Sequence, residues 1–257
     1  MHDLDWRIQR AEIGPTQVCY DSVAISICVC SFDRVMASPF VLKRQSEQSK
    51  RTPRLAMRRI RRLRRAELPV DTTELARYLI GKTLVRDLPE GRVSGRIVET
   101  EAYPIGDAAG HAFRGQTPGN RSLFLEHGHC YVYFIYGSSW LANVTSEEPG
   151  TGGAVLLRAI EPVEGIPIMM RNRGGSRIRD VARGPGRLAA AMGIDKRQDG
   201  LDLCSPRSPL WLGAAVQPTG PIGVTTRIGL TKEAHRRLRF YERDSAFVSG
   251  PRHLLTK

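Results

Sequence analysis

The chain lacks a long apolar run, a cysteine framework and a nucleotide-binding motif, and each absence excludes a class of protein. No apolar stretch approaches the roughly 18 residues that span a bilayer, and the first residues lack the basic-then-apolar order of a signal peptide. Five cysteines make an odd count without disulfide-scaffold spacing. There is neither a P-loop nor a dinucleotide-binding fingerprint. We therefore expect a reduced, cytoplasmic protein with no membrane partner.

Acidic residues are too few to balance the basic ones. Asp and Glu number 26 against 39 Lys and Arg, which gives a formal net charge of +13 and a pI of about 10.1. Such an excess favours a polyanionic partner, because phosphates release counterions when basic groups bind them. We therefore expect a nucleic acid as the partner, and hence a protein associated with the nucleoid in a bacterium or nuclear in a eukaryote.

The basic excess is concentrated near the N-terminus. Residues 1–66 carry 14 basic and 6 acidic side chains, and the densest run is 54–67. No sustained helical or alternating pattern occurs here, so we expect a basic, poorly ordered extension over 1–66. Met36 and Met57 offer alternative starts within it. Residues 67–257 are expected to form one domain.

Local patterns after residue 67 predict short strands and a few helices. Asp71 or Thr72 can cap a helix that stops at Gly81. Segments 82–87 and 92–100 flank LPEG and predict a β-hairpin. Further strands are expected at 130–136, 140–146, 154–160, 225–230 and 238–249, and further helices at about 160–172 and 184–194. Strands in meander order with helices between them indicate a single α+β domain with a mainly antiparallel sheet.

Two acids end an otherwise apolar strand in GRIVETEAY, residues 95–103. If the pleat is regular, Glu99 and Glu101 share a face with Ile97. A carboxylate in such a place is desolvated, which raises its pKa and suits it to general acid–base catalysis. An arbitrary pair of this kind is more often ion-paired or solvent-facing. Arg158, in the apolar run AVLLRAI, strengthens the catalytic interpretation, because a buried arginine needs an acidic partner.

Tyrosines cluster in the strand-like segment YVYFIYG. Alternation places Tyr131 and Tyr133 on one face and Tyr136 on the other, unless the turn at Gly137 swings Tyr136 outward. Core packing explains Tyr131 best, whereas a tyrosine at a hairpin tip can wedge between base pairs. The neighbouring HGHC at 127–130 lacks the second ligand pair of a zinc site, so we expect no metal there.

Seven ordered blocks of the chain carry a family resemblance. They are GRIVETEAY, DAAGHAFRGQTPGNRSLF, GHCYVYFIYG, LANV, AVLLRAIEP, GPGRL with the following GI, and LRFYERDSAFVS. Together they resemble the alkyladenine DNA glycosylase family, also called 3-methyladenine or methylpurine DNA glycosylases. The resemblance covers residues 74–249 approximately and excludes 1–66. It implies a single mixed α/β domain with a curved antiparallel sheet flanked by helices, working as a monomer without metal or cofactor.

The resemblance also implies an enzyme of base excision repair. The family flips damaged purines of the 3-methyladenine, 7-methylguanine and hypoxanthine type out of duplex DNA and hydrolyses the N-glycosidic bond, which leaves an abasic site. Glu101 is similar to the general base that activates the attacking water, and Arg158 to a side chain that helps to hold this water. The backbone carbonyl of Ile228 matches a third water ligand. The matched motifs contain no lysine, so hydrolysis without a lyase step is expected.

Five further residues match the family's base-binding and DNA-distorting positions. Tyr103, His111 and Tyr133 resemble the walls that sandwich the flipped base, and His111 also resembles a hydrogen-bond donor to it. Asn143 corresponds to the residue that crowds the exocyclic amino group of normal guanine. Tyr136 resembles the finger that fills the vacated position in the base stack.

Some residues depart from the family pattern, and two other interpretations remain open. Ser138, Ser139 and Leu141 stand where many members carry bulkier or different residues, and the loop 104–114 is short. The acceptance of bulky etheno adducts is therefore open. A non-catalytic nucleic-acid-binding module would explain the charge and the tyrosines but not the acids. A carboxylate hydrolase of a small sugar or nucleoside would explain the acids but not the charge.

Overall fold

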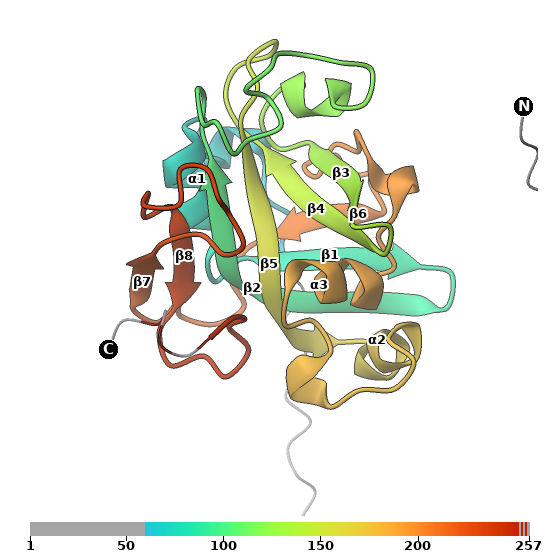
Figure 1. Ribbon diagram of the computed structural model, residues 1–257. Helices are drawn as coiled ribbons and strands as arrows, with labels where there is room; N and C mark the ends of the chain where they lie inside the picture. Colours follow the sequence, from blue (N-terminus) through green and yellow to red (C-terminus); the bar gives the residue numbers. More distant parts are fainter. Residues whose placement is uncertain (1–59, 252, 254, 256–257) are drawn as a thin grey trace, which may run out of the picture. The chain divides into compact units, whose positions relative to one another are not determined.

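An antiparallel sheet organises the part of the chain that the structure, a computed structural model, describes: residues 60–251, 253 and 255 (Figure 1). The main path of the sheet is β3-β4-β5-β2-β1-β6, while β8 pairs with β2 and β7 pairs with β8. The strands are β1 (Thr83–Leu88), β2 (Gly91–Tyr103), β3 (Cys130–Ile135), β4 (Ser139–Thr145), β5 (Ala154–Glu164), β6 (Leu210–Gly213), β7 (Ile222–Thr225) and β8 (Arg239–Glu242). The α+β class with a curved antiparallel sheet is confirmed.

Three α-helices and four short 3-10 helices accompany the sheet in the described residues. They are α1 (Thr72–Leu79), α2 (Ile166–Asn172) and α3 (Pro185–Ala191), with 3-10 turns at Arg65–Glu67, Arg121–Phe124, Ile178–Asp180 and Lys196–Gln198. Asp71 caps α1 as expected, since its carboxylate accepts the amide hydrogens of Thr73 and Glu74, both at 2.8 Å. In the described part of the chain, no helix has the length and apolarity needed to cross a membrane.

Two bulges interrupt the pairing of β2 with β5 where the acids lie. Ile97 pairs with Ile160 and Glu99 with Ala159, so Val98 is an extra residue on β2. The next pair is Thr100 with Leu157, so Arg158 is an extra residue on β5.

The bulge at Val98 reverses the alternation of β2. Ile97 faces the main core, and so does Thr100, whose hydroxyl donates to the carbonyl of Ala76 in α1 at 2.8 Å. Glu99 and Glu101 therefore lie on the opposite face from Ile97. Our expectation of a shared face, which assumed a regular pleat, is wrong.

The predicted elements differ from the observed ones mainly after residue 160. β5 runs to Glu164 instead of ending at 160, because Glu161 pairs across the sheet with Arg96 and bonds its guanidinium at 2.7 Å. The helix expected from about 160 therefore starts only at Ile166, after a turn at Gly165 with φ 70°.

The two C-terminal strands also differ from the expected ones: the strand predicted at 225–230 is wrong, because β7 (Ile222–Thr225) precedes that segment, and β8 is shorter than the predicted 238–249. β7 ends at Thr225, and the chain from there to 230 is irregular, with φ 77° at Gly229. β8 ends at Glu242, before Asp244 with φ 65°. β6 was not predicted at all, because four apolar residues are too few to show a period.

Residues 60–66, which we assigned to the basic extension, pack on the domain. Leu63 is 2% exposed and belongs to the main core, and its amide donates to the carbonyl of Leu212 in β6 at 2.9 Å. Arg65 forms ion pairs with Glu126 at 3.2 Å and Asp202 at 2.8 Å. The packed domain thus begins before residue 67, whereas residues 1–59, with Met36 and Met57, lie outside the described residues.

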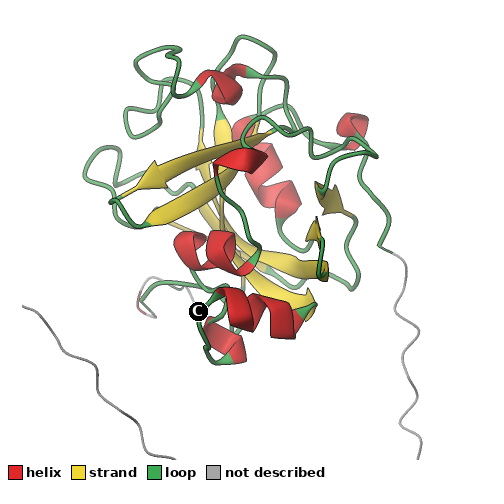
Figure 2. Ribbon diagram, turned by 90° about the vertical axis from the view of Figure 1, so that its right-hand side faces the viewer, coloured by secondary structure: helices red, strands yellow, loops and turns green. Residues whose placement is uncertain are grey.

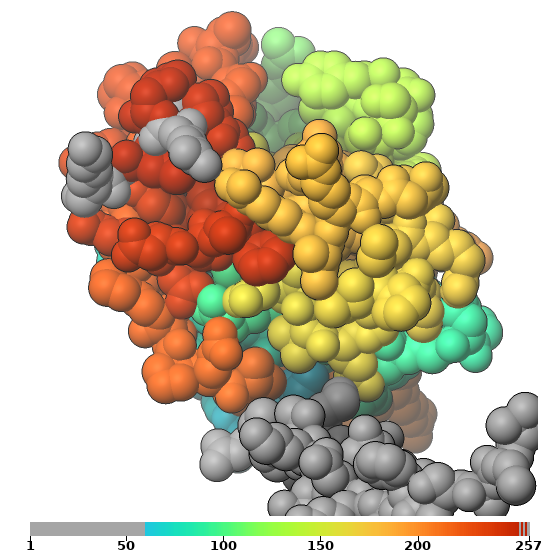
Figure 3. All heavy atoms as spheres, turned by 90° about the horizontal axis from the view of Figure 1, so that it is seen from below, coloured from blue at the N-terminus to red at the C-terminus, as the bar shows by residue number. Residues whose placement is uncertain are grey.

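Two of the loops gather at one end of the sheet. The end of β2, the start of β3, the end of β4 and the start of β5 are neighbours by register, so the loops 104–129 and 146–153 lie together (Figure 2). At another side, the C-terminal segment lies against the chain around α3 (Figure 3). There Arg183 donates to the carbonyl of Val248 at 2.7 Å, which holds residues 245–249 near the acids of β2.

We predict that Leu63→Ala lowers the free energy of unfolding by about 2–4 kcal/mol, because it leaves a cavity in the main core. The neighbouring Arg64→Ala, whose side chain is 83% exposed, serves as the control and should change it by less than about 0.5 kcal/mol. Urea denaturation of the full chain measures both. Equal and negligible effects would mean that residues 60–66 do not belong to the folded unit.

Candidate active site

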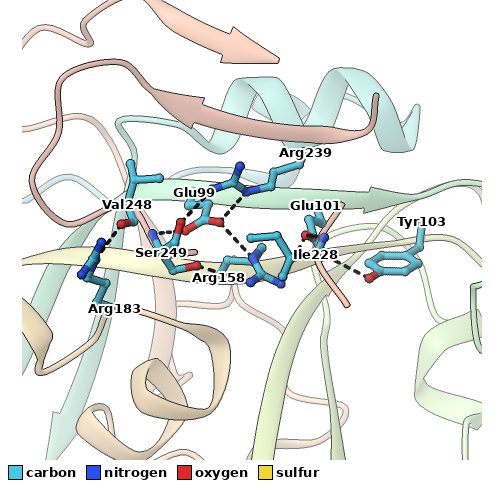
Figure 4. A network of polar contacts seen from close by, with 9 residues as sticks. All are labelled: Glu99, Glu101, Tyr103, Arg158, Arg183, Ile228, Arg239, Val248 and Ser249. Carbon is cyan, nitrogen blue, oxygen red and sulfur yellow. Dashed lines mark hydrogen bonds and ion pairs between the residues drawn. The ribbon is translucent and has the colours of Figure 1, made fainter. Parts of the chain in front are cut away.

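Glu99 is a fully buried carboxylate that ties three parts of the fold together (Figure 4). Its Oε1 accepts hydrogen bonds from Nε of Arg158 in β5 at 2.9 Å and Nε of Arg239 in β8 at 2.7 Å. Its Oε2 accepts the amide hydrogen of Ser249 at 2.6 Å. Burial alone would raise its pKa, but the two guanidinium groups and these hydrogen bonds hold the pKa of Glu99 below its usual range.

Glu101, two residues along β2, is equally buried but is less well compensated. Its Oε1 accepts the amide hydrogen of Ile228 at 2.7 Å and lies 3.2 Å from Nη1 of Arg158. Its Oε2 accepts the hydroxyl hydrogen of Tyr103 at 3.0 Å. Burial raises the pKa of Glu101, with a smaller contribution from the charge of Glu99, and these partners only partly offset the effect.

Arg158 therefore reaches both acids from its bulge in β5, as its position in an apolar run predicted. The guanidinium is 7% exposed, and the neighbouring carboxylates raise its pKa despite burial. The two acids are pushed in opposite directions: Glu99 is held ionised, while Glu101 is closer to protonation. Such a split suits one carboxylate to structure and the other to proton transfer.

A cavity of about 180 Å³ opens beside Tyr103, under the loops that follow β2. Tyr103, His111, Tyr133 and Asn143 all line it, so four predicted site residues from three separate segments meet here. The His111 and Tyr133 rings lie 4.3 Å apart between centroids, too close to admit a flat ligand between them. These two rings therefore line the cavity together, without a gap for a flat group between them.

The polar atoms of the cavity are oriented by a neighbour that we had explained by core packing alone. Tyr131 is 3% exposed, and its hydroxyl lies 2.8 Å from Nδ1 of His111. Burial lowers the pKa of His111 and raises that of Tyr131, so a neutral imidazole faces a protonated phenol. If the phenol donates to Nδ1, the imidazole carries its hydrogen on Nε2. Nδ2 of Asn143 is also held, because it donates to the carbonyl of Tyr131 at 3.1 Å.

Tyr136 lies at the tip of the β3–β4 hairpin and is 86% exposed. Its φ is 54° and that of Gly137 is 64°, as in a type I′ turn, and the amide of Ser138 donates to the carbonyl of Ile135 at 3.2 Å. A bulky aromatic residue is unfavourable at positive φ. The turn thus keeps a highly exposed tyrosine in a backbone conformation that is energetically unfavourable for it.

Several residues of the site were not predicted individually. Arg239 and Ser249 hold Glu99. The signal for Arg239 was an arginine in the apolar run LRFYE, the same kind that indicated Arg158, whereas Ser249 contributes its backbone amide, which the sequence pattern does not reveal. Ile228 was predicted through its carbonyl, but it is its amide that contacts Glu101. In the HGHC segment, Cys130 is buried, and within residues 60–251 no group of three or more His, Cys, Asp or Glu is arranged to hold a metal ion.

The sequence was compared with known proteins. The family model described as "Methylpurine-DNA glycosylase (MPG)" matches residues 66–246. The chain belongs to this family. It is thus a methylpurine-DNA glycosylase family member, and the expected family is confirmed.

Curated relatives agree with this assignment. A "Putative 3-methyladenine DNA glycosylase" of Mesorhizobium japonicum is 68% identical over 190 residues, which is 74% of this chain and 91% of the relative. Proteins of the same name from Paraburkholderia phytofirmans and Methanocella arvoryzae are 57% and 46% identical, covering 75% and 69% of this chain and 90% of each relative. The methylpurine-DNA glycosylase scaffold thus extends over nearly all of the packed domain.

We predict opposite effects of neutralising the two acids of this glycosylase on stability. Glu99→Gln removes the partner of two buried guanidinium groups and should cost about 3–5 kcal/mol. Glu101→Gln replaces a carboxylate whose pKa is already raised and should leave the unfolding midpoint unchanged or higher. Thermal unfolding at pH 7 measures both.

The pH dependence provides the control. The stability that Glu99 contributes is present above the unfolded pKa of about 4.3 and is lost as the pH falls through its lower folded pKa. Glu99→Gln should therefore lose less stability than the wild type between pH 5 and pH 2. Equal acid sensitivity in both proteins would contradict this assignment.

Proposed function

We propose that this glycosylase removes damaged purines from duplex DNA in base excision repair, with Glu101 as the general base. The observation that carries the proposal is the position of Glu101: a buried carboxylate with a raised pKa, bonded to the tyrosine that walls the cavity. A general base works best when its pKa approaches the working pH. A non-catalytic binding module would have no use for such a group.

In the proposed reaction, Glu101 takes a proton from a water as this water attacks C1′ of the deoxyribose. The N-glycosidic bond breaks and its electron pair leaves with the purine, which yields an abasic site. Arg158 and the backbone carbonyl of Ile228 help to hold the water. A purine alkylated at N3 or N7 is cationic and leaves as a neutral base, whereas hypoxanthine takes up a proton as it departs.

The proposed substrate enters the cavity by base flipping, which costs a few kcal/mol and costs less at damaged pairs. Tyr103 on one side and His111 with Tyr133 on the other stack on the extruded purine, and Asn143 crowds the amino group of normal guanine. The rim is basic, because Arg114 and Lys232 line the hollow next to the cavity. The cavity wall itself contains no lysine in the described chain, which supports a hydrolytic, monofunctional reaction.

We expect Glu101→Gln to abolish excision while it preserves lesion binding. The assay incubates duplex oligonucleotides that contain hypoxanthine or 3-methyladenine and cleaves the resulting abasic sites with alkali. The wild type should show single-turnover rates that rise with pH through the raised pKa of Glu101. Full excision by the variant would refute the assigned base, and binding without excision by the wild type would favour the non-catalytic module.

We also expect Tyr136→Asn to separate stability from DNA binding. Asparagine suits the positive φ of this turn, so the thermal midpoint should stay the same or rise. Binding to a lesion duplex should weaken about tenfold or more, because the finger no longer fills the base stack. Excision from single-stranded DNA is the control and should change much less. An equal loss on both substrates would argue against the finger.

A further inference from the structure

A buried ion pair between Arg227 and Asp107 lies beside the cavity, which Asp107 helps to line. Both side chains are 0% exposed, and the guanidinium binds the carboxylate through two hydrogen bonds, of 2.5 Å to Oδ2 and 3.1 Å to Oδ1. Nη1 of Arg236 lies 3.6 Å from Oδ2, so a second cation is also near this carboxylate. Two desolvated charges are expensive to bury, and an apolar pair of similar size often serves folding equally well. The pair therefore calls for a role that uses its geometry.

The guanidinium of Arg227 supports the first wall of the cavity. Its central carbon lies 4.6 Å from the centroid of the Tyr103 ring, a cation–π contact. Its Nη1 also donates to the carbonyl of Ala102 at 3.0 Å, the residue between Glu101 and Tyr103. The end of β2 is thus held at its backbone and at its aromatic ring by one side chain.

The same residue fixes the segment on the other side of Glu101. Ile228 follows Arg227 directly, and its amide donates to Oε1 of Glu101. The chain then turns at Gly229, and Leu230 lines the cavity. Asp107 belongs to the loop that leads to His111 and lines the cavity too. The ion pair therefore connects three segments that meet around Glu101 and the cavity.

We propose that Arg227, held by Asp107, is a positioning residue that sets the Tyr103 ring and the Ile228 amide against Glu101. The proposal rests on the function proposed above, and it adds how Glu101 and the Tyr103 ring are held in a fixed position relative to each other. The planar fork matters, because lysine keeps the charge but cannot bind a carboxylate, a carbonyl and a ring face together.

The test compares Arg227→Lys with Arg96→Lys. Arg96 is a matched control: it is a buried arginine of β2, 5% exposed, paired with Glu161 and Glu242, and it does not line the cavity. Single-turnover excision of hypoxanthine is measured from pH 5 to pH 9 and expressed per folded molecule. Arg227→Lys should lose about 10- to 100-fold in rate, because small displacements of catalytic groups are costly. Arg96→Lys should keep the wild-type rate.

The pH profile supplies a readout that a merely structural role would not move. The Ile228 amide and the Tyr103 hydroxyl both stabilise the ionised Glu101, so their displacement should move the acid limb of the profile to higher pH, by up to about one unit. The other charged or titratable groups around Glu101 stay in place in this variant: Glu99, Arg158, Arg239 and Tyr133. Arg96→Lys should leave the limb unshifted.

Other outcomes would overturn the proposal. The ion pair would be purely structural if a folded Arg227→Lys variant kept the wild-type excision rate and pH profile. The same conclusion would follow if its excision rate fell only as much as that of Arg96→Lys. If Arg227→Lys does not fold, Asp107→Asn replaces it, with the same expected shift. Should the wild type excise no lesion, the proposed function fails, and hydrogen exchange of the Ile228 amide decides the positioning: exchange must accelerate in the variant and not in the control.

Discussion

The carboxylate of Glu99 is the group on which the rest of the site depends. It is completely buried. Its charge is tolerated there because Arg158, Arg239 and the amide of Ser249 donate hydrogen bonds to its oxygens. These partners come from β5, β8 and the C-terminal segment, so one charge joins three elements to β2. With Nε fixed on Glu99, the rest of the Arg158 guanidinium is directed at Glu101. The structural acid thereby places the cation that the second acid uses.

The two bulges explain why both acids can lie there at all. A regular β2 would direct Glu99 and Glu101 to the same face as Ile97, into the core under α1. The extra residue Val98 reverses the alternation, and the extra residue Arg158 on the partner strand compensates the register. Each irregular pair disrupts the hydrogen-bond ladder locally and changes the direction of nearby side chains. Bulges are frequent beside functional sites for this reason, and here they lie beside the candidate site.

The sequence could predict features that depend on a local pattern or on a single charged residue within an apolar segment. The cap at Asp71, the first hairpin and the pairing of Arg158 with an acid follow from neighbours or from the cost of burying a charge. The reversal at Val98 could not be predicted, because nothing in RIVETE distinguishes a bulge from a regular pleat. The extended reading of TTRIGL failed for a related reason: Arg227 bonds across the fold to Asp107, and a contact 120 residues away leaves no local pattern.

The net charge was a poorer guide to DNA contacts than to the class of partner. Some of the arginines that produce the +13 are used inside the domain: Arg65 binds two acids, and Arg96, Arg158, Arg227 and Arg239 are buried in ion pairs. A buried guanidinium cannot release counterions from a phosphate. Arg114 and Lys232, which line the hollow next to the cavity, do not belong to these internal ion pairs. The formal charge of +13 therefore overstates the positive charge that the folded domain presents to a polyanion, because internal carboxylates neutralise part of it.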